Sequence, residues 1–197
     1  ANVWFDREQD RLVYNIEDPD YRLLSAGADV DRKTEIDPTQ RTARSDGRSP
    51  ANILTSTCSD ELAVHYGGRS KIFAVSIKDR GAVSMAGHAG KAFWFSKKTG
   101  EFVTSGYYYD RYPAWVTEWN AGRPAAAYSG KAWELTHEPS KYLFGDRDDR
   151  FYETDIAGFG RTFPHAYGEF GDKYFTTKLT LGPAGDGLTL DFAKTLL

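Results

Sequence analysis

Residues 71–77 form a short, mostly apolar run with polar residues on both sides. Such a run is typical of a strand that is buried on both faces of a parallel sheet. A helix is predicted shortly before it, because residues 59–62 have helix-start chemistry and Gly67 and Gly68 can end the helix. A helix that leads into a buried strand indicates an α/β layer, so we expect an α/β fold.

Other patterns predict the remaining elements. We expect hairpins at residues 2–16 and 93–104, and helices that begin at Pro50 and Pro113 and that cover residues 172–181 and 186–197. The last helix keeps an apolar face up to Leu196, so we expect a helix that is still running where the sequence stops, and hence a fragment. The polar composition of residues 27–47 predicts a loop. Residues 124–171 are rich in Gly, Asp, Arg and aromatic residues without a sustained period, which predicts an irregular segment.

Composition excludes several classes of protein. The 197 residues are 40% hydrophobic, enough for a substantial core in one domain or one large piece of a domain. The net charge of −3 provides no broad basic field, so we expect no nucleic-acid partner and no anionic membrane partner. The longest apolar stretch, residues 72–75, is far below the roughly 20 residues that a membrane helix needs.

The cysteine and the histidines predict no metal site within this chain. Cys58 is the only cysteine, which excludes an internal disulfide, and we interpret it as a small buried hydrophobe. The four histidines are His65, His88, His137 and His165, and none has the spacing that gathers zinc ligands on one face. We interpret all four as structural and expect only His88 to lie near a functional site.

Two cations follow directly after the predicted buried strand. Ligands of open α/β sheets bind beyond the carboxyl ends of the strands, and Lys78 and Arg80 stand at this end. At i and i+2 of an extended chain their side chains point the same way, which suits a phosphate dianion. The alternative is a solvated strand end, with Asp79 as a local counter-ion.

Aromatic residues gather in the middle of the chain. Residues 93–95 and 107–109 could stack on a sugar or a base, although packing in strands and core explains them more simply. A non-catalytic module that binds a carbohydrate or a protein therefore stays open as an alternative. We interpret Arg161 as a surface or structural residue.

Several stretches carry a resemblance to a known family. Residues 76–83, with Lys78 and Arg80, and residues 87–94 resemble the signature of the phosphate-irrepressible branch of bacterial alkaline phosphatases. Further stretches that are similar in kind and in order are residues 1–6, 13–18, 112–116, 160–165 and 190–193. The resemblance therefore covers nearly the whole chain. It is weakest at residues 27–47, which form a longer loop than is usual for the family.

The resemblance implies a function and a set of residues. It implies hydrolysis of phosphomonoesters with two zinc ions, in which Asn2, Lys78 and Arg80 bind the phosphate oxygens and so count as catalytic residues. The serine or threonine nucleophile and the zinc ligands of the family would lie outside this chain. The partners implied are small-molecule phosphate esters, and the location implied is periplasmic or secreted. A phosphodiesterase or nucleotide pyrophosphatase of the same superfamily is the alternative.

The same resemblance implies a three-layer α/β/α core with an irregular α+β cap insertion. Residues 1–90 would form part of the catalytic core with the phosphate-binding strand end. Residues 91–171 would form the cap, and residues 172–197 would return to the core in a helix that is truncated at its end.

Overall fold

The structure, a computed structural model, describes residues 2–197, so the first residue of the opening segment lies outside it. The strands are β1 (Val3–Asp6), β2 (Arg11–Tyr14), β3 (Phe73–Ser76), β4 (Lys91–Ser96), β5 (Glu101–Val103), β6 (Ala132–Trp133) and β7 (His165–Ala166). The α-helices are α1 (Cys58–His65), α2 (Asp79–Ala86), α3 (Ala114–Ala121), α4 (Phe175–Leu179) and α5 (Pro183–Lys194). Short 3₁₀ turns lie at η1 (Gln40–Thr42), η2 (Pro124–Tyr128), η3 (Pro139–Lys141) and η4 (Gly145–Arg147).

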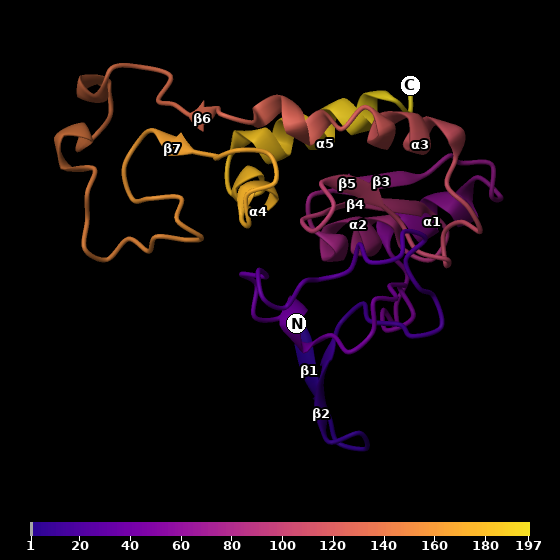
Figure 1. The fold of residues 1–197 in the computed structure, drawn as a ribbon. Coiled ribbons are helices and arrows are strands. Elements are labelled where there is room, and N and C mark those ends of the chain that lie inside the picture. The colour runs from indigo at the N-terminus through magenta and orange to yellow at the C-terminus, as the bar shows by residue number, and fades with distance from the viewer. Residues whose placement is uncertain (1) are drawn as a thin grey trace.

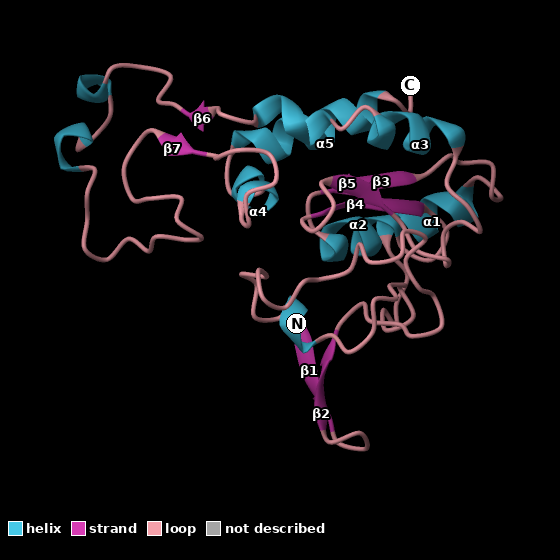
Figure 2. Cartoon of the chain, in the orientation of Figure 1, coloured by secondary structure: helices cyan, strands magenta, loops and turns pink. Residues whose placement is uncertain are grey.

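Three layers make up the main body. The central layer is the sheet β3-β4-β5, in which β3 is parallel to β4 and β4 is antiparallel to β5. Helices α3 and α5 cover one face of this sheet and α2 covers the other, as Figure 1 and Figure 2 show. The expected α/β fold with three layers is confirmed.

Strand β4 is the strand that is buried on both faces. Phe93 and Phe95 pack into the core below α3 and α5, whereas Ala92 and Trp94 pack into the core beside α2. The prediction for residues 71–77 was wrong in this respect, because Phe73 of β3 is 40% exposed. The reason is topological: β4 has a partner strand on each side, whereas β3 is the end strand of the three described.

Aromatic packing fills the core below α3 and α5. Phe192 of α5 is fully buried and stacks on Phe102 with 4.3 Å between the ring centroids. Phe192 also meets Phe93, Trp115 and Trp119. The expectation that residues 93–95 serve packing is therefore met, since rings that are buried in the core cannot offer a stacking face to a ligand.

Several predicted helix boundaries were wrong. No helix begins at Pro50, because the buried Ser49 hydroxyl donates a hydrogen bond to Asp18 and the following residues make a single turn. Helix α4 begins only at Phe175, since the Asp172 carboxylate accepts from a backbone N–H of the preceding turn. Helix α5 does not run to the end of the chain but stops at Lys194.

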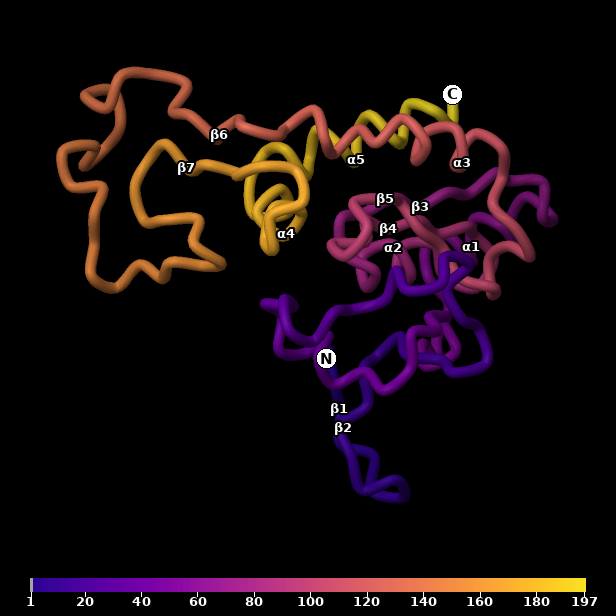
Figure 3. The backbone as a smooth tube through the Cα atoms, viewed as in Figure 1, coloured from indigo at the N-terminus to yellow at the C-terminus, as the bar shows by residue number. Residues whose placement is uncertain are grey.

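Residues 124–171 are irregular, as expected. They contain only short 3₁₀ turns and the two-residue strands β6 and β7. Figure 3 shows this segment, in orange, leaving the layered body as a long excursion before α4. The predicted division at residues 90 and 91 falls between β3 and β4, two paired strands of one sheet.

Arg161 lies on the surface and pairs with Asp149 at 2.6 Å.

Helix α1 has a capping box at Thr57 and Asp60, and the two glycines that follow it have positive φ angles. Cys58, in its first turn, is exposed, so the prediction of a buried cysteine was wrong. Among residues 2–197, the structure has no helix of the length and hydrophobicity that a membrane crossing requires.

Helix α2 ends at Gly87, which has φ 61° and ψ −152°. A Cβ atom there would collide with the Thr57 hydroxyl and the Asp60 carboxylate. We expect Gly87→Ala to lower the free energy of unfolding by about 1–3 kcal/mol, measured by chemical denaturation. Gly67→Ala is the matched control, because Gly67 also has positive φ but an added Cβ meets nothing. An effect of Gly87→Ala no larger than that of the control would contradict the steric part of this prediction.

Candidate functional site

Lys78 and Arg80 lie at the junction between β3 and α2. Lys78 has extended backbone angles, φ −104° and ψ 137°, and is the N-cap of the helix, whereas Arg80 already belongs to the first helical turn. The prediction that both follow an extended strand end was therefore wrong in its backbone geometry. The positive end of the α2 dipole adds to their positive charge, and anions are favoured near such an end.

The two side chains nevertheless converge on one atom. Lys78 Nζ and Arg80 Nη2 each lie 3.0 Å from Asp37 Oδ2. Lys78 is half-exposed, whereas the Arg80 side chain is only 16% exposed. The structure thus brings the two predicted cations together, with a single carboxylate oxygen between them.

Asp37 is presented by the polar loop of residues 27–47. Its other carboxylate oxygen, Oδ1, accepts hydrogen bonds from the Thr39 backbone N–H at 2.9 Å and from the Thr39 hydroxyl at 2.6 Å. Burial by itself would raise the pKa of Asp37, but the hydrogen bonds from Thr39, Lys78 and Arg80 outweigh it and hold this pKa below its ordinary value. Asp37 is therefore an anion at neutral pH.

Arg80 is held on a second edge as well. Its Nη1 donates to the Thr39 hydroxyl at 2.6 Å and to the Tyr14 hydroxyl at 3.3 Å. Burial by itself would lower the pKa of Arg80, but Tyr14 and Asp37 raise this pKa by a larger amount. The net shift is upward, and the guanidinium stays charged. Its orientation is fixed by groups from β2 and from the loop.

Asp79, between the two cations in sequence, faces into the protein. It is 3% exposed, and its carboxylate accepts from Tyr14 at 2.7 Å, from Gln40 at 2.8 Å and from Arg48 Nε at 2.9 Å. Burial would raise the pKa of Asp79, but the charge of Arg48 and the hydrogen bonds that the carboxylate accepts together outweigh it and lower this pKa. The same burial, together with Asp79, raises the pKa of Tyr14. Asp79 is thus the partner of buried Arg48, and the counter-ion of Lys78 and Arg80 is Asp37.

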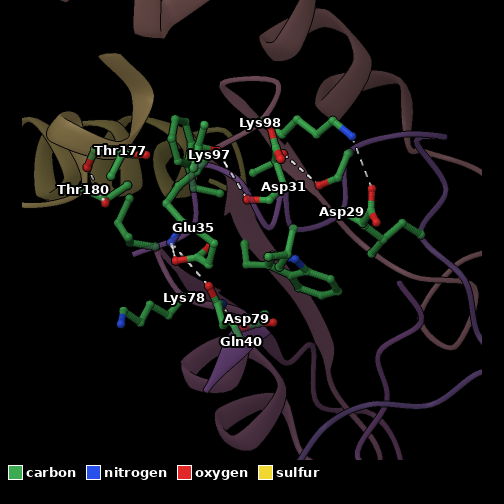
Figure 4. A pocket seen from close by; sticks show the side chains of 18 of the residues that line it. Asp29, Asp31, Glu35, Gln40, Lys78, Asp79, Lys97, Lys98, Thr177 and Thr180 are labelled. Atoms are coloured by element: carbon green, nitrogen blue, oxygen red, sulfur yellow. Dashed lines mark hydrogen bonds and ion pairs between the residues drawn. The ribbon is translucent and has the colours of Figure 1, made fainter. Parts of the chain in front are cut away.

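Further contacts attach the loop to the sheet. Lys97, at the turn after β4, pairs with Glu35 and lies 3.3 Å from the side-chain oxygen of Gln40. Glu35, Gln40 and Lys97 line a small cavity of about 50 Å³. Figure 4 shows these residues together, with the Lys78 side chain directed away from Asp79. The loop expected at residues 27–47 is therefore attached to the protein at two places, by Asp37 at the start of α2 and by Glu35 at the turn after β4.

Sequence reasoning missed four of these residues, namely Tyr14, Asp37, Gln40 and Arg48. Tyr14, Gln40 and Arg48 lie between 31 and 65 positions from their partner Asp79. Asp37 lies 41 positions from its partner Lys78, so no local spacing links any of them to the site. No sequence signal distinguishes these four residues from other polar residues of the chain. The fold, and not a motif, assembles this cluster.

The approach of Asn2 to the cations stays a prediction. Its backbone carbonyl accepts from the Asn15 N–H at 3.0 Å, and the neighbouring pair Val3 and Tyr14 lies in register across β1 and β2. Tyr14 in turn reaches Arg80. Asn2 thus directly precedes β1, whose partner strand β2 contacts Arg80 through Tyr14, and Asn2 itself is exposed.

His88 belongs to a different cluster. Its ring nitrogens lie 3.0 Å from Asp60 Oδ2 and 3.0 Å from the Ile53 carbonyl oxygen, an arrangement that joins α1 to the end of α2. Burial would raise the pKa of Asp60, but the hydrogen bonds from His88 and Thr57 lower it. His88 is thus a structural residue, as expected, but its side-chain contacts are with Asp60 and Ile53 and not with Lys78 or Arg80.

Comparison with known proteins assigns the family. No family model matches the chain. It is 32% identical over 196 residues to the alkaline phosphatase PhoV of Synechococcus elongatus, and 30% identical over 197 residues to the alkaline phosphatase PafA of Elizabethkingia meningoseptica. The chain belongs to the alkaline phosphatase family. Each match covers 98% of this chain but 33% of the relative, so the chain spans about a third of the length of these proteins.

Other matches extend the comparison. A calcium-transporting ATPase of Myroides odoratus is 35% identical over 149 residues, which is 75% of this chain and 27% of that protein. The crystal structure of PafA superimposes on the whole chain, with a TM-score of 0.79, 27% identity and 35% of that chain covered. A crystallised PafA variant gives 0.78 with 26% identity, over 99% of this chain and 35% of its own. Its substitutions are at a threonine, an asparagine, a lysine and the arginine two residues after that lysine.

Proposed function

We propose that the full-length protein is a zinc-dependent phosphomonoesterase and that Asn2, Lys78 and Arg80 bind the phosphate of its substrate. The observation that carries this proposal is the convergence of Lys78 and Arg80 on one anionic oxygen at 3.0 Å each. A carboxylate oxygen and a phosphate oxygen accept the same charge-assisted hydrogen bonds from these groups. The family of the chain supports the phosphatase chemistry.

The chain's own residues have separate roles in this proposal. Lys78 is half-exposed and acts as a point charge, whereas the partly buried Arg80 guanidinium is pre-oriented by Tyr14 and Thr39. Such fixed positive groups stabilise the charge that redistributes over the phosphoryl oxygens in the transition state. The asparagine, lysine and arginine substituted in the PafA variant have counterparts of the same types here, with the same spacing between lysine and arginine.

Residues 2–197 offer no set of zinc ligands. Among residues 2–197 no three His, Cys, Asp or Glu side chains form a group that could hold a metal ion. The zinc ligands of the proposed enzyme would therefore belong to other parts of the full-length protein, and the resemblance to the family implies the same for the nucleophile. When bound, zinc would supply activation of the nucleophile and stabilisation of the leaving oxygen, and the residues described here would bind and orient the phosphate.

The metal proposal gives a direct test. After dialysis, the 197-residue chain should retain no zinc at a defined stoichiometry and should not turn over a phosphate ester. The physical reason is the absence of a ligand cluster among the described residues. Metal analysis that finds two zinc ions per chain would contradict the assignment of the ligands to other segments.

The substrate class is tested in the full-length protein. We expect it to hydrolyse an aryl phosphate monoester in preference to the methyl diester with the same leaving group, because two cations favour the dianion. A preference for the diester would instead favour the phosphodiesterase or nucleotide pyrophosphatase alternative. By resemblance to the family we also propose a periplasmic or secreted location.

A further inference from the structure

The position where Lys78 and Arg80 meet is already occupied by an anion of the protein itself. Asp37 Oδ2 accepts from both cations, and its side chain is only 11% exposed. The carboxylate lies between the two groups that are proposed to bind phosphate. Its single negative charge cancels one of the two positive charges in their neighbourhood.

The loop holds this carboxylate with hydrogen-bond donors of its own. The Thr39 backbone N–H and hydroxyl both donate to Oδ1, whereas Lys78 and Arg80 donate to Oδ2. The aspartate turn that results is a common local motif, and it fixes the direction of Oδ2. This turn would hold Asp37 beside the cations when a phosphate group binds to their other donor atoms.

We propose that Asp37 is a specificity-determining residue that reduces the preference of this site for doubly charged phosphate groups. The inference rests on the proposed function, because it assumes that Lys78 and Arg80 bind the substrate phosphoryl group. An anion beside the binding position repels a dianion about twice as strongly as it repels a monoanion. Asp37 thus penalises a monoester more than a diester.

Removal of the charge should therefore shift the substrate ratio. In the full-length protein we expect Asp37→Asn to raise the ratio of kcat/KM for an aryl phosphate monoester to that for the matching methyl diester by at least about tenfold. A unit charge at about 6 Å with an effective dielectric constant near 20 accounts for a change of this size after screening by solvent. Asparagine keeps an oxygen for the Thr39 donors, so the turn is conserved.

Two variants separate charge from structure. Asp37→Glu keeps the charge and should leave the ratio near that of the wild type. Asp29→Asn removes the same charge from the same loop, but Asp29 is 42% exposed and pairs with Lys98 at 3.6 Å, so its ratio should stay unchanged. If Asp37→Asn does not fold, Asp37→Ser should change the ratio in the same direction, since a serine side chain can also make this turn.

The outcomes decide between the two proposals. A ratio that is unchanged or lower in Asp37→Asn, while the wild type prefers the monoester, overturns the role of Asp37 and shows that it only positions the cations. A wild-type protein that hydrolyses neither ester overturns the proposed function, and this inference with it. A shift in Asp29→Asn that equals the shift in Asp37→Asn would also overturn the inference, because it would reflect the net charge of the loop.

Discussion

Replacing Lys78 and Arg80 together with alanine in the full-length protein should lower kcat/KM for a phosphate monoester by at least about 100-fold. Each charge-assisted hydrogen bond contributes roughly 1.5–3 kcal/mol, and two lost bonds account for this factor. Hydrolysis of a diester should fall far less, since its phosphoryl group carries one charge and has one fewer free oxygen. The measurement compares both esters with the same leaving group.

A control variant with the same change in charge makes this result specific. Lys98 and Arg161 lie on the surface, paired with Asp29 and Asp149 respectively. We expect Lys98→Ala combined with Arg161→Ala to leave both activities near the wild-type values. Equal losses of monoester and diester activity in the Lys78 and Arg80 variant would show a structural or general electrostatic role, and the monoesterase proposal would lose its main support.

Removal of the buried Asp79 carboxylate should have the largest effect on the free energy of unfolding. We expect Asp79→Ala to lower the free energy of unfolding by about 3–5 kcal/mol, because it leaves Arg48 buried without its ionic partner. The side chains of this pair are each 4% exposed, so water cannot replace the lost interaction. Chemical denaturation of the full-length protein, followed at neutral pH, measures the change.

An exposed aspartate provides the comparison. Asp146 is 79% exposed and lies 3.7 Å from Arg147, so Asp146→Ala should change stability by no more than about 0.5 kcal/mol. A loss for Asp79→Ala as small as that for Asp146→Ala would contradict the structural role of the buried pair.

The pH dependence of this pair has a defined sign. The pKa of Asp79 is lower in the folded protein than its ordinary value of 3.8. Its contribution to stability is therefore fully present above pH 3.8 and is lost as the pH falls through the lower folded value. The difference in stability between the wild type and Asp79→Ala should shrink over that acidic range.

The sequence determined the elements that depend on local patterns. The hairpin at residues 93–104 and the helix after Pro113 have strong turn and cap signals, and both are present as β4-β5 and α3. The helix predicted after residue 59 is present as α1 for the same reason. The resemblance of residues 76–83 and 87–94 was sufficient to indicate the family and the two cations of the site.

Other features depend on partners that are distant in sequence. An apolar run of four to seven residues has the same composition in an end strand and in a central strand, so only strand order reveals that β4 is the strand buried on both faces. Ser49 and Pro50 have helix-start chemistry, but Asp18 binds the Ser49 hydroxyl and a turn forms instead. Local propensity lost in that case to a hydrogen bond made across 31 positions.

The site itself divides in the same way. The sequence by itself identified Lys78 and Arg80 as a pair of cations at a strand end, although the extended geometry predicted for them was wrong. Only the tertiary structure decided which anions they meet, since Asp37 arrives from a loop 41 positions away and Asp79 turns inward to Arg48. Charge complementarity acts through space at about 3 Å, and no spacing along the chain encodes which carboxylate will fill that distance.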